Sequence, residues 1–342
     1  MSAATVLVFV LVAALAAVNG SNDVPKGVAT LAGAGVTRYR TAILWGTATT
    51  LIGCVCSLVL ASKMTKLFSG GIVTGKPTEA FAVAVLAGAA GWVGTATVLR
   101  LPVSTTHALI GGLLGAGLLL GPGAIAWGGI PGKLVIPLLI SIGVAYAVSL
   151  LLALLFGRPG KTPAHVTSVP AEGRVAVREA PAAVAEKTSH RVLTVAHWFT
   201  SGATGFARGL NDTPKIVAIG AFALVPAGMR LWQIMLLVAG AMAVGSVVGG
   251  MRVARRLGEG VVKMNHREGF LANLTTASLV GLGAGYGLPM STTHVSTGAI
   301  AGSAGPNLSR LSARTLRDFL IAWLVTPPFA AAVAALVFAL AR

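Results

Sequence analysis

The chain has 342 residues, of which 55% are hydrophobic and only 10% are charged. This composition excludes an ordinary soluble domain and predicts a protein that crosses a lipid bilayer several times. The formal charge of +17 would suggest a nucleic-acid partner in a soluble chain. Here most lysines and arginines lie in loops between apolar segments, where membrane topology explains them, so we expect no nucleic-acid partner.

Ten apolar segments are long enough to cross a bilayer. They cover residues 3–36, 41–62, 80–99, 102–121, 134–156, 192–225, 231–250, 270–286, 289–306 and 318–341. A polar stretch rich in Pro, Lys, Arg, Glu and Ala separates the first five from the last five. The sequence therefore predicts an all-α protein with a transmembrane repeat at 1–156, a cytoplasmic linker at 157–191 and a second repeat at 192–342.

The first apolar segment contains the motif GSNDVPKG, residues 20–27. Asn22, Asp23 and Lys26 are thereby predicted to lie at membrane depth, where ionisable side chains are costly and mark functional sites. Pro25 removes a backbone donor, and together with the flanking glycines it predicts that the helix breaks here. Backbone groups freed by such a break could line an ion site if they are buried in protein.

The motif returns as GLNDTPK at residues 209–215, and a repeat extends over most of the chain. The second motif supplies Asn211, Asp212 and Lys215. PTEAFAVAVLAG at 77–88 matches HREGFLANLTTA at 266–277, and LPVSTTHALIGG at 101–112 matches LPMSTTHVSTGA at 288–299. Each repeat has five predicted crossings, an odd number, so the two copies must have opposite orientations. Broken helices in inverted repeats are typical of secondary transporters.

The distribution of basic loop residues predicts the topology. With the N-terminus outside, most lysines and arginines outside the motifs fall on the cytoplasmic side. We therefore expect a multi-pass protein of the cell membrane with both termini outside and the central loop in the cytoplasm. The segments near 80–121 and 270–306 could be re-entrant hairpins instead of full crossings.

The charged motif residues suit a cation or a proton. A carboxylate and an amide carbonyl are hard oxygen ligands, although an Asn-Asp pair that caps a helix break is an alternative. Lys26 and Lys215 could neutralise the aspartates or bind an anion directly. Glu79 and Glu268 begin matching segments, where either interfacial solvation or cation coordination explains them.

A Ser-Thr-Thr-His sequence follows Pro102 and again Pro289. Proline at a helix start, with hydroxyls in the first turn, predicts an anion site made by free N–H groups and the helix dipole. Hydrogen bonds from the hydroxyls to their own helix are the alternative. The candidate anion ligands are Ser104, Thr105, Thr106, Ser291, Thr292 and Thr293. His107 and His294, which close the motifs, could relay protons or serve the structure.

These residues resemble the inorganic phosphate transporter (PiT) family, whose hallmarks are G-x-N-D and P-x-S-[ST]-T-H in each of two inverted halves. The resemblance implies a transporter, not an enzyme, that takes up phosphate together with H⁺ or Na⁺. It implies no cofactor besides this coupling ion and no definite metal site. It implies cation coordination by the Asn-Asp pairs and phosphate binding by the triplets. Many members have N-D-x-A-N, and the last Asn resembles a sodium ligand. Lys26 and Lys215 replace it here, which favours proton coupling.

Several alternatives stay open. A sulfate or other oxyanion permease of the same fold, a sodium-coupled phosphate symporter and a passive channel would share these motifs. An intramembrane enzyme with Ser104 as nucleophile and His107 as base is a further alternative, but it leaves the duplication unexplained. A homo-oligomer is compatible with the sequence.

Overall fold

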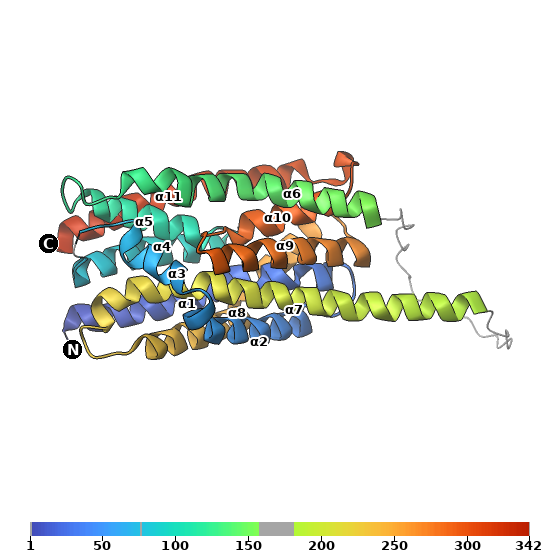
Figure 1. The fold of residues 1–342 in the computed structure, drawn as a ribbon, viewed down its shortest axis with the longest axis horizontal. Helices are drawn as coiled ribbons and strands as arrows, with labels where there is room; N and C mark the ends of the chain where they lie inside the picture. Colours follow the sequence, from blue (N-terminus) through green and yellow to red (C-terminus); the bar gives the residue numbers. More distant parts are fainter. Residues whose placement is uncertain (1, 76, 157–180, 342) are drawn as a thin grey trace.

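The computed structural model describes residues 2–75, 77–156 and 181–341, without the side chains of 181–190. Its α-helices (Figure 1) are α1 Ala3–Gly33, α2 Tyr39–Leu60, α3 Ser62–Lys66, α4 Glu79–Val98, α5 Thr105–Leu118, α6 Ile136–Phe156, α7 Pro181–Leu224, α8 Leu231–Gly260, α9 His266–Tyr286, α10 Thr292–Ser303 and α11 Ala313–Ala341. Four short π- and 3-10 helices are η1 Leu67–Gly71, η2 Trp127–Gly129, η3 Pro131–Val135 and η4 Leu308–Arg310. The predicted all-α class is confirmed.

Six helical stretches in the described part of the chain are long and apolar enough to cross a membrane. However, α5 and α10 have only 14 and 12 residues. At 1.5 Å per residue they are about 21 and 18 Å long, against about 30 Å of hydrocarbon. Of the two alternatives for 102–121 and 289–306, these lengths favour re-entrant hairpins over full crossings. Apolar residues continue past the ends of both helices, and hydropathy does not mark where a helix stops.

Two hairpins, α4 with α5 and α9 with α10, replace those crossings. Figure 1 shows α4 and α5 in the left half of the bundle and α9 and α10 in the right half. The end of the first hairpin tip, residues 102–104, is buried, and Asn22 of α1 donates to the adjoining Leu101 carbonyl. The helices α1 and α7 run in opposite directions along the bundle, and the start of α1 and the end of α11 lie at the same end (Figure 1).

The helices that carry the Asn-Asp motifs are continuous. Pro25 lies inside α1 and Pro214 lies inside α7, so the predicted breaks are wrong. Membrane helices tolerate proline where neighbouring helices pack closely and satisfy the freed backbone groups. Here α8 packs on α1 beside Pro25, and the Ser21 hydroxyl donates to the Gly245 carbonyl of α8 at 2.6 Å. The two residues of this contact are 224 positions apart in the chain, so no local sequence pattern shows it.

The two halves exchange packing partners. The first helix of each half packs along the second helix of the other, α1 on α8 and α7 on α2. The last helix of each half packs on the hairpin of the other, α6 on α9 and α10, and α11 on α4 and α5. A Cβ at Gly20 would clash with the Met242 carbonyl, and a Cβ at Gly245 with the Ala17 carbonyl. Small residues therefore bring α1 and α8 into backbone contact, as in other membrane helix pairs.

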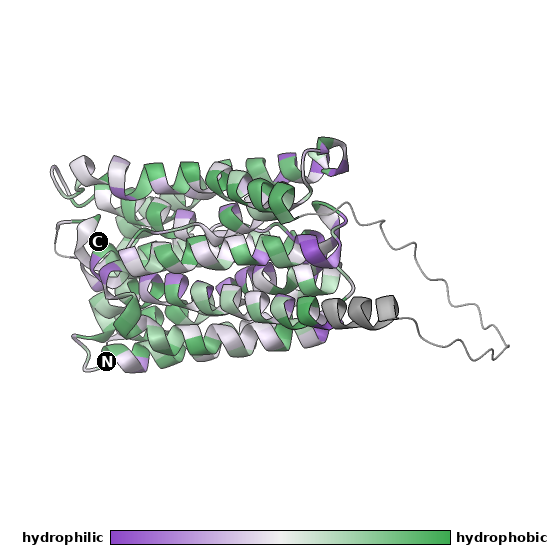
Figure 2. Cartoon of the chain, turned by 45° about the vertical axis from the view of Figure 1, so that its right-hand side comes forward, coloured by the Kyte–Doolittle hydropathy of each residue, from purple (hydrophilic) through white to green (hydrophobic). Residues whose placement is uncertain are grey.

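The outer surface suits a bilayer. Figure 2 shows apolar residues along the helices and many hydrophilic residues at the right-hand ends of the bundle. In the most apolar part of α11, and in that of the stretch that contains α6, only 22% of the residues are buried inside the protein. Both therefore present a broad apolar face to lipid. Of the predicted linker, 157–180 lie outside the described residues, and the remainder belongs to α7.

Candidate functional site

The structure brings the two Asn-Asp-Lys motifs together with the two hydroxyl triplets. The motifs come from the C-terminal halves of α1 and α7, and the triplets from the starts of α5 and α10. Every residue of this central cluster is at most 5% exposed: Asn22, Asp23, Lys26, Ser104, Thr105, Thr106, Asn211, Asp212, Lys215, Ser291, Thr292 and Thr293. The cluster therefore contains the charged groups of both halves in one buried place.

Lys26 lies in a cage of oxygen atoms. Its ammonium donates to a carboxylate oxygen of Asp23, to the Val103 carbonyl at 2.8 Å and to the Thr293 hydroxyl. An ammonium has three donors, and all three are used. This pairing satisfies a buried charge that would otherwise be strongly unfavourable.

Lys215 has the matching cage in the other half. Its ammonium lies 2.6 Å from the Thr106 hydroxyl, 3.3 Å from the Met290 carbonyl and 3.4 Å from Asp212 Oδ1. Each cage thus combines the aspartate three residues before the lysine, a backbone carbonyl of the same half and a threonine of the other half. The two ammonium groups cross-link the halves.

The asparagines fix the hairpin tips. Asn22 donates to the Leu101 carbonyl at 2.9 Å, and its amide oxygen accepts from the Val103 N–H at 3.0 Å. Asn211 donates to the Met290 carbonyl at 3.0 Å. The Asn22 oxygen thus accepts a backbone N–H, whereas the Asn211 oxygen has no hydrogen-bond partner among the described residues. Cation coordination by the two asparagines stays a prediction.

The triplet residues divide into helix caps and cage members. Ser104 and Ser291 are the N-caps of α5 and α10 and accept from the backbone N–H three residues on. An N-cap oxygen accepts one bond and keeps its hydroxyl proton for another acceptor. Thr106 and Thr293 instead donate to the Met290 and Val103 carbonyls at 3.3 and 2.6 Å.

Thr105 is also engaged, since it donates to Asp23 at 3.2 Å and accepts from Asn19 at 2.9 Å. In this arrangement the hydroxyls of Thr105, Thr106 and Thr293 donate to protein oxygen atoms, and anion binding by the triplets stays a prediction. The first N–H groups of α5 and α10 have no intrahelical acceptor, as at any helix start. These N–H groups and the two serine hydroxyls are among the donors available to an anion.

Arg208 is a member of the cluster that sequence reasoning missed. It lies one turn before Asp212 on α7 and is 1% exposed. Its Nη1 lies 3.5 Å from Asp212 Oδ2 and 3.9 Å from Asp23 Oδ2. The available signal was its spacing: Arg208, Asp212 and Lys215 share one helix face.

Glu79 and Glu268 are not brought to the cluster. Glu79 accepts from Ser2 and Thr5 at 2.6 and 2.9 Å, at the far end of α4 from the hairpin tip. Glu268 caps the start of α9 and forms a 2.7 Å ion pair with Arg310, whose pKa it raises. Both glutamates therefore begin the hairpins, about 30 Å along a 20-residue helix from the tips. These contacts favour the interfacial alternative over a role in the central cluster.

The histidines join the hairpins. The rings of His107 and His294 lie against one another with centroids 4.7 Å apart, and His294 also packs on Trp323 at 4.3 Å. Ser104 Oγ accepts from the His107 backbone N–H, and no bond between this oxygen and the His107 ring is present among the described residues. A nucleophile–base pair is therefore not assembled here.

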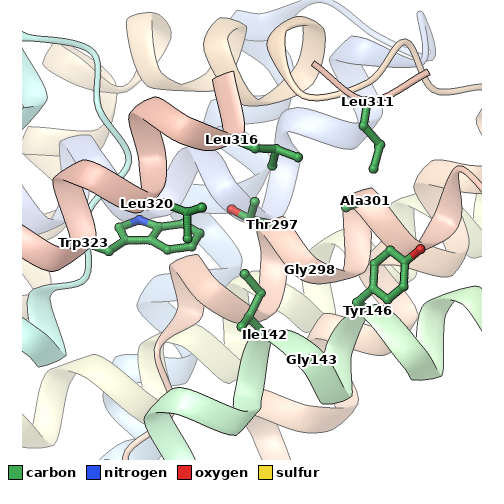
Figure 3. Close-up of a pocket in the computed structure, with 10 residues that line it drawn as sticks. All are labelled: Ile142, Gly143, Tyr146, Thr297, Gly298, Ala301, Leu311, Leu316, Leu320 and Trp323. Atoms are coloured by element: carbon green, nitrogen blue, oxygen red, sulfur yellow. The ribbon is translucent and has the colours of Figure 1, made fainter. Parts of the chain in front are cut away.

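A separate cavity of about 310 Å³ lies between α6, α10 and α11. Figure 3 shows that its lining is almost entirely apolar, with Thr297 the only labelled residue of α10 that carries a side-chain oxygen. No residue of the central cluster lines it. This cavity is therefore not the site to which the motifs point.

Comparison with known proteins agrees with the motifs. The sequence pattern of the phosphate transporter family matches residues 19–334. The chain is 30% identical to a probable low-affinity inorganic phosphate transporter of Mycobacterium bovis, over 98% of this chain and 77% of that one. It is also 30% identical to a protein of the same description from Rhizobium meliloti, over 94% and 91%.

Among solved structures, a sodium-dependent phosphate transporter has the same fold, with a TM-score of 0.78 at 22% identity over 99% of both chains. The shared fold agrees with the family match, which covers nearly the whole chain. This chain belongs to the phosphate transporter family.

Proposed function

We propose that this protein is a secondary transporter that takes up inorganic phosphate and is driven by protons, not by sodium. The family and the names of the relatives support the substrate. The observation that carries the choice of proton is the pair of matched lysine cages. We infer that the chain forms two inverted repeats, and that alternating access moves one against the other around the central cluster.

The anion is proposed to bind between the starts of α5 and α10. Free N–H groups and the positive ends of both helix dipoles favour an anion there. The hydroxyl protons of Ser104 and Ser291 add uncharged donors at the two N-caps. Lys26 and Lys215 contribute positive charge nearby, although their own donors are already used within the cages.

The cages support a sodium-independent mechanism. Carboxylate, carbonyl and hydroxyl oxygens are hard ligands of the kind that an alkali cation prefers. In this chain an ammonium that cannot diffuse away occupies each set. A fixed cation removes the need for Na⁺ beside Asp23 and Asp212, and it leaves proton binding as the step that a gradient can drive.

Sulfate transport is the second candidate. Phosphate at neutral pH carries a proton that it can donate, whereas sulfate has none. Asp23 and Asp212 are buried acceptors next to the helix starts, and an acceptor that faces the anion favours phosphate because an unpaired buried carboxylate is costly.

The charge bias of the loops supports N- and C-termini outside the cell.

The test is uptake of radiolabelled phosphate by purified protein in liposomes. We expect accumulation driven by an inward proton gradient, equal rates with Na⁺ and with choline, and weak competition by sulfate. A strict sodium requirement would refute proton coupling, and stronger competition by sulfate than by unlabelled phosphate would make sulfate the substrate. Equilibration without accumulation under any ion gradient would indicate a channel.

A further inference from the structure

Arg208 breaks the symmetry of charge between the two halves of the central cluster. It lies four residues before Asp212, and the residue four before Asp23 is Asn19. Asn19 donates to Asp23 Oδ2 at 2.7 Å and to Thr105 at 2.9 Å, so an uncharged amide is sufficient to hydrogen-bond the aspartate of the first half. The arginine at the matching position of the second half adds a positive charge that this hydrogen bonding does not require.

Arg208 also changes the net charge of the central cluster. Two lysines balance two aspartates in the cages, and Arg208 adds a third cation without a third carboxylate. In formal terms one positive charge is left over. A surplus buried charge is strongly unfavourable unless a counter-ion joins it, so the resting cluster favours the arrival of an anion.

The guanidinium also keeps one edge free. Only Nη1 approaches the carboxylates, at 3.5 Å from Asp212 and 3.9 Å from Asp23. Nε and Nη2 are buried and have no hydrogen-bond partner among the described residues. These two nitrogens form the side edge of the guanidinium, whose parallel N–H groups match two oxygens of one carboxylate or phosphate.

We propose that the Nε/Nη2 edge of Arg208 binds two oxygen atoms of the transported tetrahedral oxyanion. This inference rests on the proposed function and makes Arg208 a direct substrate ligand. The anion then neutralises the surplus charge and completes the donors that α5 and α10 begin. Bound phosphate lies closer to α7 than to α1, since Asn19 offers no equivalent edge.

The experiment measures binding of radiolabelled phosphate to the detergent-purified full chain. Arg208→Lys keeps the charge and the approach to the aspartates but removes the two-pronged edge. We expect affinity for phosphate to fall about 10- to 150-fold, which corresponds to the loss of a charged hydrogen bond. Arg256→Lys is the matched control, because Arg256 forms a 2.8 Å ion pair with Asp318 outside the cluster, and its affinity is expected to be unchanged.

A second readout separates binding from structure. A purely structural Arg208 would lower the thermal unfolding temperature without phosphate and leave the phosphate-induced increase intact. A ligand role reduces that increase. Unchanged affinity in Arg208→Lys would overturn the proposal, while absence of phosphate binding in the unmodified protein would overturn the proposed function instead.

If Arg208→Lys does not yield folded protein, the double variant Arg208→Gln with Asp212→Asn takes its place, because it keeps the formal charge of the cluster. We expect this variant to lose phosphate affinity despite the unchanged charge. Affinity equal to that of the unmodified protein would mean that charge alone recruits the anion, and it would overturn the proposal.

Discussion

The ammonium of Lys26 in α1 binds the hydroxyl of Thr293 in α10, across the two halves of the chain. The reciprocal contact joins Lys215 in α7 to Thr106 in α5 at 2.6 Å. Each contact connects a long helix to a hairpin tip that lies far away in the sequence. Any movement of one half against the other must therefore stretch or exchange these two bonds. They link the central cluster directly to such a movement.

Removal of one cage hydroxyl is predicted to destabilise the protein. Thr293→Val keeps the shape of the side chain but leaves one donor of the buried Lys26 without an acceptor, which costs about 1–3 kcal/mol. Thermal unfolding in detergent measures the change. Thr276→Val is the control, since Thr276 is also buried and, within the described part of the chain, its hydroxyl bonds to the Ala272 carbonyl of its own helix. Equal stability of the two variants would contradict the cage.

The aspartates are predicted to be essential for coupling. Asp23→Asn and Asp212→Asn keep size and hydrogen bonding but remove the group that a proton can charge or neutralise. We expect each variant to lose accumulation driven by a proton gradient, and any residual phosphate exchange to become insensitive to the gradient. Liposome uptake with and without an imposed pH difference measures both effects.

Asp318→Asn is the control for that experiment, because Asp318 lies outside the cluster and pairs with Arg256. Glu79→Gln is a second control, since Glu79 bonds to Ser2 and Thr5 at the start of α4. Both should keep gradient-driven uptake. The assignment is wrong if a double Asp23→Asn, Asp212→Asn variant still concentrates phosphate.

The sequence was sufficient to predict the class, the membrane location and most of the central cluster. Two copies of Asn-Asp-x-Pro-Lys and of Pro-x-Ser-Thr-Thr-His cannot arise from composition, and both copies lie in the cluster. The sequence was insufficient where packing between distant segments determines the local structure. Pro25 stays inside α1, where α8 packs with Gly250 beside Pro25 and with the Gly245 carbonyl on Ser21, and local sequence rules do not show these contacts.

Arg208 and the glutamates show the same limit. A single arginine in an apolar segment has no pattern of its own, and its role depends on Asp23, which belongs to the other half. Glu79 and Glu268 occupy matching positions, but they lie at the outer starts of the hairpins, and sequence spacing does not say which end of a hairpin enters the bundle.

Backbone contact between α1 and α8 is predicted to tolerate no added methyl group. In Gly20→Ala the new Cβ would overlap the Met242 carbonyl, and such overpacking typically costs about 1–3 kcal/mol. Gly91→Ala is the control, because a Cβ there meets nothing within 4 Å and alanine favours a helix by roughly 0.5–1 kcal/mol over glycine. We expect the unfolding temperature to fall in the first variant and not in the second. A decrease of equal size in both would contradict the packing.

The last prediction concerns the identity of the coupling ion. If Lys26 and Lys215 are fixed substitutes for sodium, their replacement by asparagine should restore the ligand set that resembles that of sodium-coupled family members. Each cage would then hold a carboxylate, a backbone carbonyl, a threonine hydroxyl and a new amide oxygen, with no resident cation. Arg208 would then be the one cation left beside the two buried aspartates, so the site would carry a net negative charge and should attract Na⁺ or take up protons.

We therefore expect the Lys26→Asn, Lys215→Asn variant to transport phosphate slowly or not at all in choline buffer and to recover when Na⁺ is added. The unmodified protein should give the same rate in both buffers. Lys63→Asn is the control for loss of a lysine, because Lys63 is exposed and outside the cages, and it should stay indifferent to sodium. A double variant that is folded and binds phosphate but gains no response to Na⁺ would show that the ammonium groups do not occupy sodium sites.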